Sequence, residues 1–311
     1  NQTREEEVMD ILDEGIVKLF PPRVVEALGE YLKDNALQEI RLKIEKPIII
    51  TSSKGEVVLS YILGREDIKY ILQRISNYSL YAYEEEIRQG FITIRGGHRV
   101  GLAGECVMDN GKVKTIRNIS SLNIRICREI LGCSKKVMKY IVEDKKVLNT
   151  LIISPPKCGK TTILRDIARN LSDGGKKISI IDERSEIAAS YLGVPQMKVG
   201  IRTDVLDNCL KSEGLIMAIR SLSPEIIICD EIGTLKDIEA LIMAFNSGVN
   251  IIVTLHGESI DDLTNRSVFK ELLENNVVER VILLSNREGV GTVENVYSLS
   301  KGGEKKWSRL Y

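Results

Sequence analysis

The sequence has no excess of either charge, and histidine and tryptophan are almost absent. Its 44 lysines and arginines balance 44 aspartates and glutamates across 311 residues, so the formal net charge is zero. This balance gives no support for nucleic-acid binding through a broadly basic surface. Two histidines, His98 and His256, are too few to favour a structural zinc site.

Long apolar runs are absent as well. No run approaches the roughly 18–20 residues that a membrane-spanning helix needs, and no charged-then-apolar leader opens the chain. The six cysteines are scattered and form no C-x-x-C pair. That pattern is typical of free thiols in a reducing cytosol. We therefore expect a cytoplasmic protein without a transmembrane segment.

The most informative segment that is present covers residues 151–162 and reads LIISPPKCGKTT. A short apolar run ends in a loop, and Gly159-Lys160-Thr161 then opens a predicted helix. This is the layout of a phosphate-binding loop, in which backbone N–H groups and a helix N-terminus surround phosphates. The predicted nucleotide-binding residues are Ser154, Pro155, Pro156, Lys157, Cys158, Gly159, Lys160, Thr161 and Thr162.

Two side chains of this loop have predicted roles in chemistry. Lys160 is expected to reach the β and γ phosphates of ATP, and the Thr161 hydroxyl to ligate Mg²⁺. Ser154 departs from the pattern, which has glycine there, and serine lacks the freedom of glycine at positive φ. The alternative interpretation is a strand–turn–helix that contains Gly-Lys-Thr by chance.

A second motif supports the nucleotide interpretation. Residues 225–231 form an apolar run that ends in Asp230 and Glu231. A buried strand there would bring Asp230 beside Thr161, where its carboxylate could hold the magnesium water shell. Glu231 would then orient and deprotonate the attacking water, which favours hydrolysis over transfer to a metabolite. The alternative is a buried strand that ends in solvated charges.

The strand predicted at 249–256 ends in Thr254 and His256. In one large class of phosphate-loop ATPases, an extra strand lies between the loop strand and the acidic strand, and a polar residue at its end senses the γ-phosphate. Both residues have the right position for that role. The alternative for His256 is a packed or solvated side chain.

The strand predicted at 177–182 also ends in charge, with Asp182, Glu183 and Arg184. The two acids are candidates to approach the catalytic water or the ribose. Arg184, Arg202 and Arg220 are candidates to stabilise the transferring phosphoryl group, which can be worth about 10³–10⁵ in rate and often comes from a neighbouring subunit. The alternative for each arginine is a surface ion pair.

Hydrophobic periodicity divides the chain into two parts. Residues 1–130 predict an α+β domain: a helix at 5–20, a shorter helix after Pro21-Pro22 that includes Val24 and Leu32, two helices within 65–89, and mostly antiparallel strands that include a hairpin turned at Asn110-Gly111. Residues 131–311 predict an α/β domain. Its strands at 149–154, 177–182, 225–230 and 250–255 alternate with helices at 161–172, 211–221 and 235–246, which implies a mainly parallel sheet covered by helices. Antiparallel strands are expected at 280–284, 292–298 and 303–311.

The chain resembles the stage III sporulation protein AA family. The resemblance rests on the phosphate loop and on segments across both domains: 39–42, 81–86, 96–102, 181–187, 202–207, 219–224, 230–233 and 254–257. That family is similar to the hexameric ATPases of bacterial secretion and type IV pilus systems. It implies a RecA-like phosphate-loop core, with Asp182, Glu183, Thr254 and His256 completing the ATP site.

The resemblance further implies a homo-oligomeric, hexameric ATPase that uses ATP and Mg²⁺ to power or assemble a membrane channel complex during sporulation. It implies a peripheral location on the mother-cell side of the forespore envelope and a membrane-protein partner; nucleic acid is not favoured as a partner. Two alternatives stay open, a nucleic-acid-stimulated motor and a nucleotide-binding scaffold with weak hydrolysis. Stimulation by nucleic acid would indicate the first, and nucleotide binding without turnover would indicate the second.

Overall fold

The structure is a computed structural model that describes residues 15–76, 83–299 and 307–311. The chain divides into two compact units, Asn1–Arg128 and Glu129–Tyr311. The division predicted from the sequence lies slightly later, at 130/131. In the described part of the chain, no helix is both long and apolar enough to cross a bilayer.

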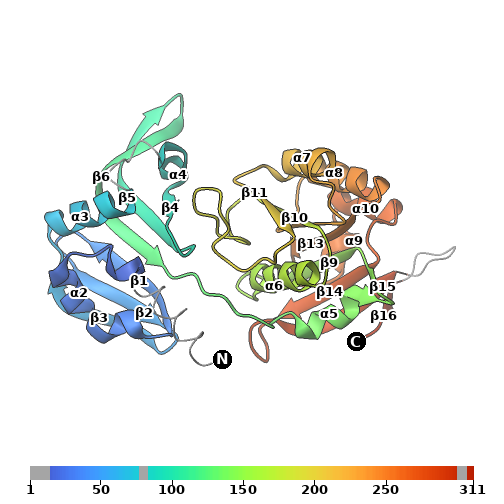
Figure 1. Cartoon of the computed structure of the whole chain (residues 1–311), viewed down its shortest axis with the longest axis horizontal. Helices are drawn as coiled ribbons and strands as arrows, with labels where there is room; N and C mark the ends of the chain where they lie inside the picture. Colours follow the sequence, from blue (N-terminus) through green and yellow to red (C-terminus); the bar gives the residue numbers. More distant parts are fainter. Residues whose placement is uncertain (1–14, 77–82, 300–306) are drawn as a thin grey trace. The chain divides into compact units, whose positions relative to one another are not determined.

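In the described part of the first unit, the strands form a six-stranded antiparallel sheet with the order β3-β2-β1-β6-β5-β4 (Figure 1). Its strands are β1 (Leu37–Lys43), β2 (Pro47–Ser52), β3 (Gly55–Ile62), β4 (Phe91–Thr93), β5 (Arg99–Asp109) and β6 (Lys112–Arg125). Its helices are α2 (Pro22–Leu28), η1 (Gly29–Lys33), α3 (Arg65–Ile75) and α4 (Glu84–Gln89). The predicted helix at 5–20 lies mostly outside the described residues, and 15–17 are helical.

Alternation in the strands of the first unit gives the sheet one apolar face. In β1, Ile40 and Leu42 are fully buried, while Glu39 is partly exposed and Arg41 and Lys43 are exposed. These side chains form one core with the buried residues of α2 and α3. The predicted hairpin is present: Asn110 and Gly111 have φ values of 49° and 76°, as a tight turn with two left-handed residues requires.

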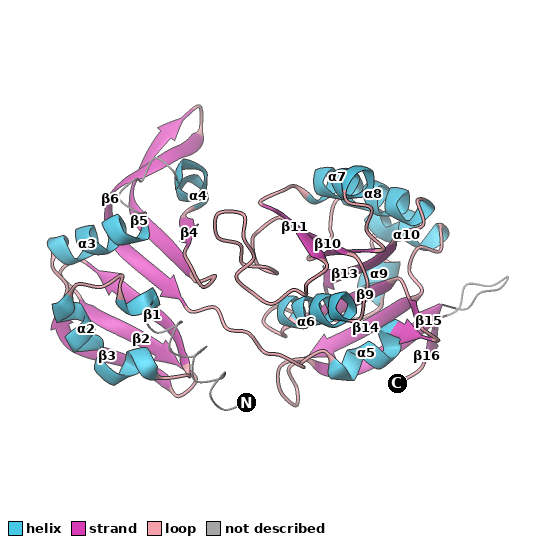
Figure 2. Cartoon of the chain, in the orientation of Figure 1, coloured by secondary structure: helices cyan, strands magenta, loops and turns pink. Residues whose placement is uncertain are grey.

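The second unit is an α/β domain (Figure 2). Among the described residues its main sheet has eight strands, in the order β11-β10-β12-β13-β9-β14-β15-β16. The strands of this unit are β7 (Val142–Glu143), β8 (Lys146–Val147), β9 (Thr150–Ser154), β10 (Ile178–Asp182), β11 (Thr203–Asp207), β12 (Ile226–Cys229), β13 (Asn250–His256), β14 (Arg280–Ser285), β15 (Thr292–Leu299) and β16 (Trp307–Arg309). Its helices are α5 (Lys135–Ile141), α6 (Lys160–Asp173), α7 (Lys211–Ser221), α8 (Leu235–Asn246), α9 (Asp261–Thr264), η3 (Ser267–Phe269) and α10 (Lys270–Glu274).

Helices cover both faces of this sheet because its central strands are apolar on both sides. In β12, Ile227 packs with α7 and α8, whereas Ile226 and Ile228 pack with α6 on the opposite face. All four residues of β12 are buried. The predicted α/β core is confirmed, including the strand between the loop strand and the acidic strand, which is β13.

Two features differ from the sequence-based expectation. The segment 203–207 forms the edge strand β11, which was not predicted. In addition, β14 is not purely antiparallel: it pairs parallel to β9 on one side and antiparallel to β15 on the other. The run of parallel pairing therefore extends from β11 through β14, and only the last two strands are antiparallel.

Candidate active site

The candidate site lies at the carboxyl ends of the parallel strands β9, β10, β12 and β13, where loops lead out of the sheet. β9 ends at Ser154, and α6 begins at Lys160. Gly159 precedes the helix in a left-handed conformation, with φ 80°. The first-turn N–H groups of a helix lack partners within it, and no side chain caps α6. This end of α6 therefore has the geometry to receive a phosphate group.

Ser154 fits the loop without backbone strain. It is the last residue of β9, is buried, and is not among the residues with positive φ. Its hydroxyl donates a hydrogen bond of 3.0 Å to the carbonyl oxygen of Pro155. Serine in place of glycine at position 154 therefore imposes no left-handed backbone strain. Lys157, by contrast, does adopt a left-handed conformation, with φ 60°.

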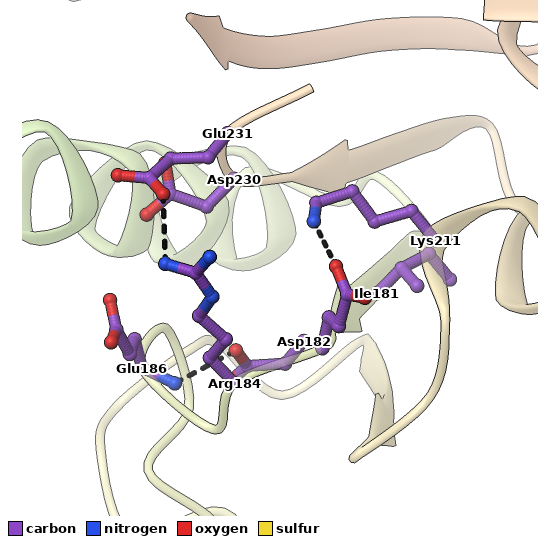
Figure 3. Close-up of a pocket in the computed structure, with 8 residues that line it drawn as sticks. Ile181, Asp182, Arg184, Glu186, Lys211, Asp230 and Glu231 are labelled. Atoms are coloured by element: carbon purple, nitrogen blue, oxygen red, sulfur yellow. Dashed lines mark hydrogen bonds and ion pairs between the residues drawn. The ribbon is translucent and has the colours of Figure 1, made fainter. Parts of the chain in front are cut away.

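Glu231 lies between two cations. Its carboxylate is 3.6 Å from the ammonium group of Lys160, which is only 6% exposed. Its other oxygen accepts a hydrogen bond of 3.1 Å from Arg184, as Figure 3 shows. Glu231 also has φ 51°, an uncommon backbone conformation for a residue with a side chain. Uncommon conformations of this kind concentrate at functional sites.

The Asp230 carboxylate is held by two threonine hydroxyls. Thr161 donates to one oxygen at 2.5 Å, and Thr254 donates to the other. The Thr254 hydroxyl in turn accepts the N–H of Glu231 at 2.8 Å. Hydroxyl and carboxylate oxygens are ligands that Mg²⁺ prefers. Thr161 and Asp230 therefore fit a magnesium ion by their chemistry. Thr254 holds the carboxylate of Asp230 and the backbone of Glu231 in place through its hydroxyl group.

A pocket beside this pair is lined by residues from three segments of the chain (Figure 3). The lining residues are Ile181, Asp182, Glu183, Arg184, Glu186, Lys211, Asp230 and Glu231. Glu183 forms an ion pair with Lys211, the first residue of α7. Lys211 was missed in the sequence analysis, because nothing in the local pattern distinguishes it from a lysine at a solvated helix start.

Asp182 has surroundings unlike those of the other acids. It is 2% exposed, and both carboxylate oxygens already accept backbone N–H groups. Burial raises the pKa of this carboxyl, and the three N–H donors oppose the rise. Its oxygens are therefore engaged with the protein backbone rather than available to water or ribose.

The remaining candidates are not gathered at the pocket within one chain. Arg202 precedes β11 at the amino edge of the sheet and donates to the carbonyl oxygen of Ser172 at 3.2 Å. Arg220 is exposed in the last turn of α7, at the opposite end of the helix from Lys211. His256 is exposed at the end of β13, next to Ser154 in the sheet register. Any role of Arg202 or Arg220 in ATP chemistry would require a neighbouring subunit.

Comparison with known proteins identifies relatives over nearly the whole chain. The family model described as "Sporulation stage III, protein AA" matches residues 2–304. "Stage III sporulation protein AA" of Bacillus subtilis (strain 168) is 47% identical over 289 residues, which cover 91% of this chain and 94% of that protein.

Two solved structures share the fold of this chain over most of its length. The chain is similar to the ATPase DotB of Legionella pneumophila, with a TM-score of 0.55 and 15% identity over 94% of this chain and 80% of that one. It is also similar to the pilus retraction motor PilT with bound ADP, with a TM-score of 0.56 and 15% identity over 92% and 80%. At this level of identity the likeness shows a shared RecA-like fold.

Proposed function

The chain belongs to the sporulation stage III, protein AA family, and from that premise we propose that it is a magnesium-dependent ATPase that works as a hexameric ring. The proposal includes a role in powering or assembling a membrane channel complex during sporulation. It places the protein peripherally on a membrane, on the mother-cell side of the forespore envelope, with a membrane protein as docking partner.

One observation carries the proposal: a lysine and a threonine at the start of α6, which follows β9, meet two acids that follow β12. Lys160, Thr161, Asp230 and Glu231 are linked to one another by the contacts described above. A core that merely contained Gly-Lys-Thr by chance would have no reason to bring Asp230 and Glu231 to this helix end. The fold shared with DotB and with PilT, which was solved with ADP, supports the same assignment.

The geometry supports a division of labour in hydrolysis. The loop and the N-terminus of α6 bind the phosphates of ATP, and the Lys160 ammonium moves from Glu231 to their β and γ oxygens. Thr161 and Asp230 would hold Mg²⁺, which neutralises charge on the phosphate oxygens. Release from Lys160 leaves Glu231 free to orient the attacking water and accept its proton.

The remaining predicted residues have proposed supporting roles. Arg184 steadies Glu231, and its guanidinium is the candidate within this chain to stabilise charge on the transferring phosphoryl group. His256 and Thr254 respond to the γ-phosphate from β13, and Glu183 borders the pocket with Lys211. Arg202 or Arg220 contributes from the neighbouring subunit of the ring.

The test is phosphate release from ATP by the purified chain and by Lys160→Ala. Lys177→Ala is the matched control, because Lys177 is exposed just before β10, at the opposite edge of the sheet. We expect turnover in the parent and the control, and a loss of about 100-fold or more in Lys160→Ala. Equal turnover in all three proteins, or none in the parent, would contradict the proposed ATPase site.

The ring is tested separately by mass in solution. We expect the molecular mass to rise to that of a hexamer when ATP and Mg²⁺ are added to Glu231→Gln, which should bind ATP without consuming it. A monomer under all conditions would contradict the ring and any role of Arg202 or Arg220 across subunits. Stimulation of turnover by nucleic acid more than about tenfold would instead favour a nucleic-acid motor.

A further inference from the structure

The segment that follows β10 is held from one side by an acid. The Asp182 carboxylate accepts the backbone N–H groups of Glu186 at 2.8 Å, Ile187 at 3.0 Å and Ala188 at 2.8 Å. Three consecutive N–H groups that point at one buried carboxylate form a closed turn. The side chain of Asp182 thereby fixes the course of the chain just after Arg184.

The carbonyl groups of the same segment are held by an arginine. Arg165, on α6, is 5% exposed. Its guanidinium donates to the carbonyl oxygen of Glu186 at 2.7 Å and to that of Ile187 at 2.5 Å. Two adjacent residues thus have their N–H groups bonded to Asp182 and their carbonyl groups bonded to Arg165. Buried backbone groups need such partners, and here two side chains provide them all.

The conformation of this segment also needs outside support. Ser185 and Ala189 have φ values of 51° and 48°, a region that residues with side chains seldom adopt. Ile187 and Ala188 are buried in the core with α6 and help to anchor the segment. Apolar burial is not directional, however, so it does not by itself select the turn that the hydrogen bonds define.

This arrangement restricts the position of Arg184. Its side chain is 66% exposed, so solvent alone would leave it many rotamers, yet it donates to Glu231 at 3.1 Å. Its backbone lies between Asp182 and the clamped residues, which restricts where the guanidinium can reach. Arg165 stands on the helix whose first residues are Lys160 and Thr161. The clamp therefore joins the phosphate-binding helix to the arginine at the catalytic acid.

We propose that Arg165 and Asp182 are positioning residues that clamp the segment 183–188 to α6 and so hold Arg184 against Glu231. This inference rests on the proposed ATPase function for its kinetic consequence, but the clamp itself is a property of the chain without nucleotide. Arg165 lies outside the phosphate loop, and its guanidinium bonds to the backbone of Glu186 and Ile187 rather than to a side chain of the ATP site.

The first experiment measures the clamp without ATP, by amide hydrogen exchange of the segment 183–190. Arg165→Gln removes the charge and the forked donor, and Arg165→Lys keeps the charge but not the fork. Arg169→Ala is the matched control: Arg169 lies one turn further along α6 and pairs with Asp166. We expect exchange at 186–188 to be at least about tenfold faster in both Arg165 variants and unchanged in Arg169→Ala.

The second experiment separates positioning from general damage by kinetics. We expect Arg165→Lys and Arg184→Ala each to lower kcat about 10-fold or more, with KM for ATP within about threefold of the parent value. If the clamp acts through Arg184, the double variant Arg165→Lys/Arg184→Ala is no slower than Arg184→Ala alone. Effects of the two substitutions that multiply would overturn the coupling.

The two experiments fail in distinguishable ways. Parent-like protection of residues 186–188 in both Arg165 variants would overturn the clamp, whatever the protein does with ATP. A parent without ATP turnover would contradict the proposed function, while faster exchange in the Arg165 variants would still establish the clamp. If Arg165→Gln does not fold, Arg165→Lys and Asp182→Asn give the same exchange readout.

Discussion

The hydroxyl of Thr161 donates a hydrogen bond of 2.5 Å to the carboxylate of Asp230, although 69 positions separate the two residues in the sequence. The pairing follows from the topology. β9 and β12 flank β13 in a parallel sheet, so the residues after them emerge at the same edge. It brings together a hydroxyl and a carboxylate that Mg²⁺ could share, and this suggests the first prediction.

Asp230→Asn should impair the proposed magnesium site while leaving the fold intact. The amide can still accept one of the two threonine hydrogen bonds, but it loses the negative charge. We expect ATP turnover to fall about 10- to 100-fold and half-maximal activity to require more Mg²⁺. The measurement is phosphate release across a magnesium titration. A variant with the magnesium dependence of the parent would argue that Asp230 does not serve the metal.

Glu231→Gln should separate binding from chemistry. The amide cannot accept the proton of the attacking water, so turnover should fall by about 100-fold or more. Loss of the negative charge also frees Lys160 from its ion pair, so a fluorescent ATP analogue should bind at least as tightly as in the parent. Both quantities are measured on the same preparation. Weaker binding with normal turnover of the bound fraction would be the opposite of this expectation.

The sequence predicted much of this site because its signals are local. Apolar strands that end in Ser154 and Asp230, and a helix that opens with Gly-Lys-Thr, are readable within a few residues. The parallel order of strands follows from helices that alternate with them. The predicted adjacency of Thr161 and Asp230 is confirmed by the hydrogen bond between their side chains.

What the sequence did not predict depends on distant partners. β11 is an edge strand with three polar residues out of five, so it lacks the apolar run that marks a buried strand. β14 pairs parallel to β9 because of where the chain returns, which no local pattern encodes. Arg165 looks like any polar residue of α6, since the carbonyl groups it binds lie 21 and 22 positions away.

Gly159→Ala should destabilise the second unit. The residue has φ 80°, and an added Cβ would lie 2.6 Å from Cγ1 of Val290. The strain and the clash together should lower the free energy of unfolding by roughly 2–3 kcal/mol. Val290 is 69% exposed, so Val290→Ala alone should cost little. The double variant should regain about 1 kcal/mol, because it removes the clash but not the left-handed strain.

Thermal or urea unfolding measures these differences. The stability regained by the double variant relative to Gly159→Ala separates the steric clash with Val290 from the backbone strain at position 159. A double variant that is as unstable as Gly159→Ala would assign the whole effect to φ. A Gly159→Ala protein with parent stability would contradict the packing of the 286–291 turn against the phosphate loop.

His98 should make the first unit less stable in mild acid. The imidazole is 1% exposed, and its Nδ1 accepts the N–H of Cys127 at 3.0 Å, so the folded state holds it neutral. Burial lowers its pKa to about 4 from the ordinary value of 6.5, and the nearby Arg128 adds to the shift. The unfolded chain therefore binds this proton more readily than the folded chain.

The contribution of His98 to stability changes with pH only below about pH 6.5. Above pH 6.5 both states are neutral at His98, and the residue contributes no slope. Between pH 6.5 and about 4, stability should decline as the pH falls, by up to about 3 kcal/mol from this group. His98→Asn keeps an acceptor for the Cys127 N–H but does not titrate. The melting temperature of this variant should therefore drop less than that of the parent between pH 7 and pH 4.5, even if it starts lower. Equal drops in melting temperature for the two proteins would show that His98 does not bind the proton that unfolds this unit.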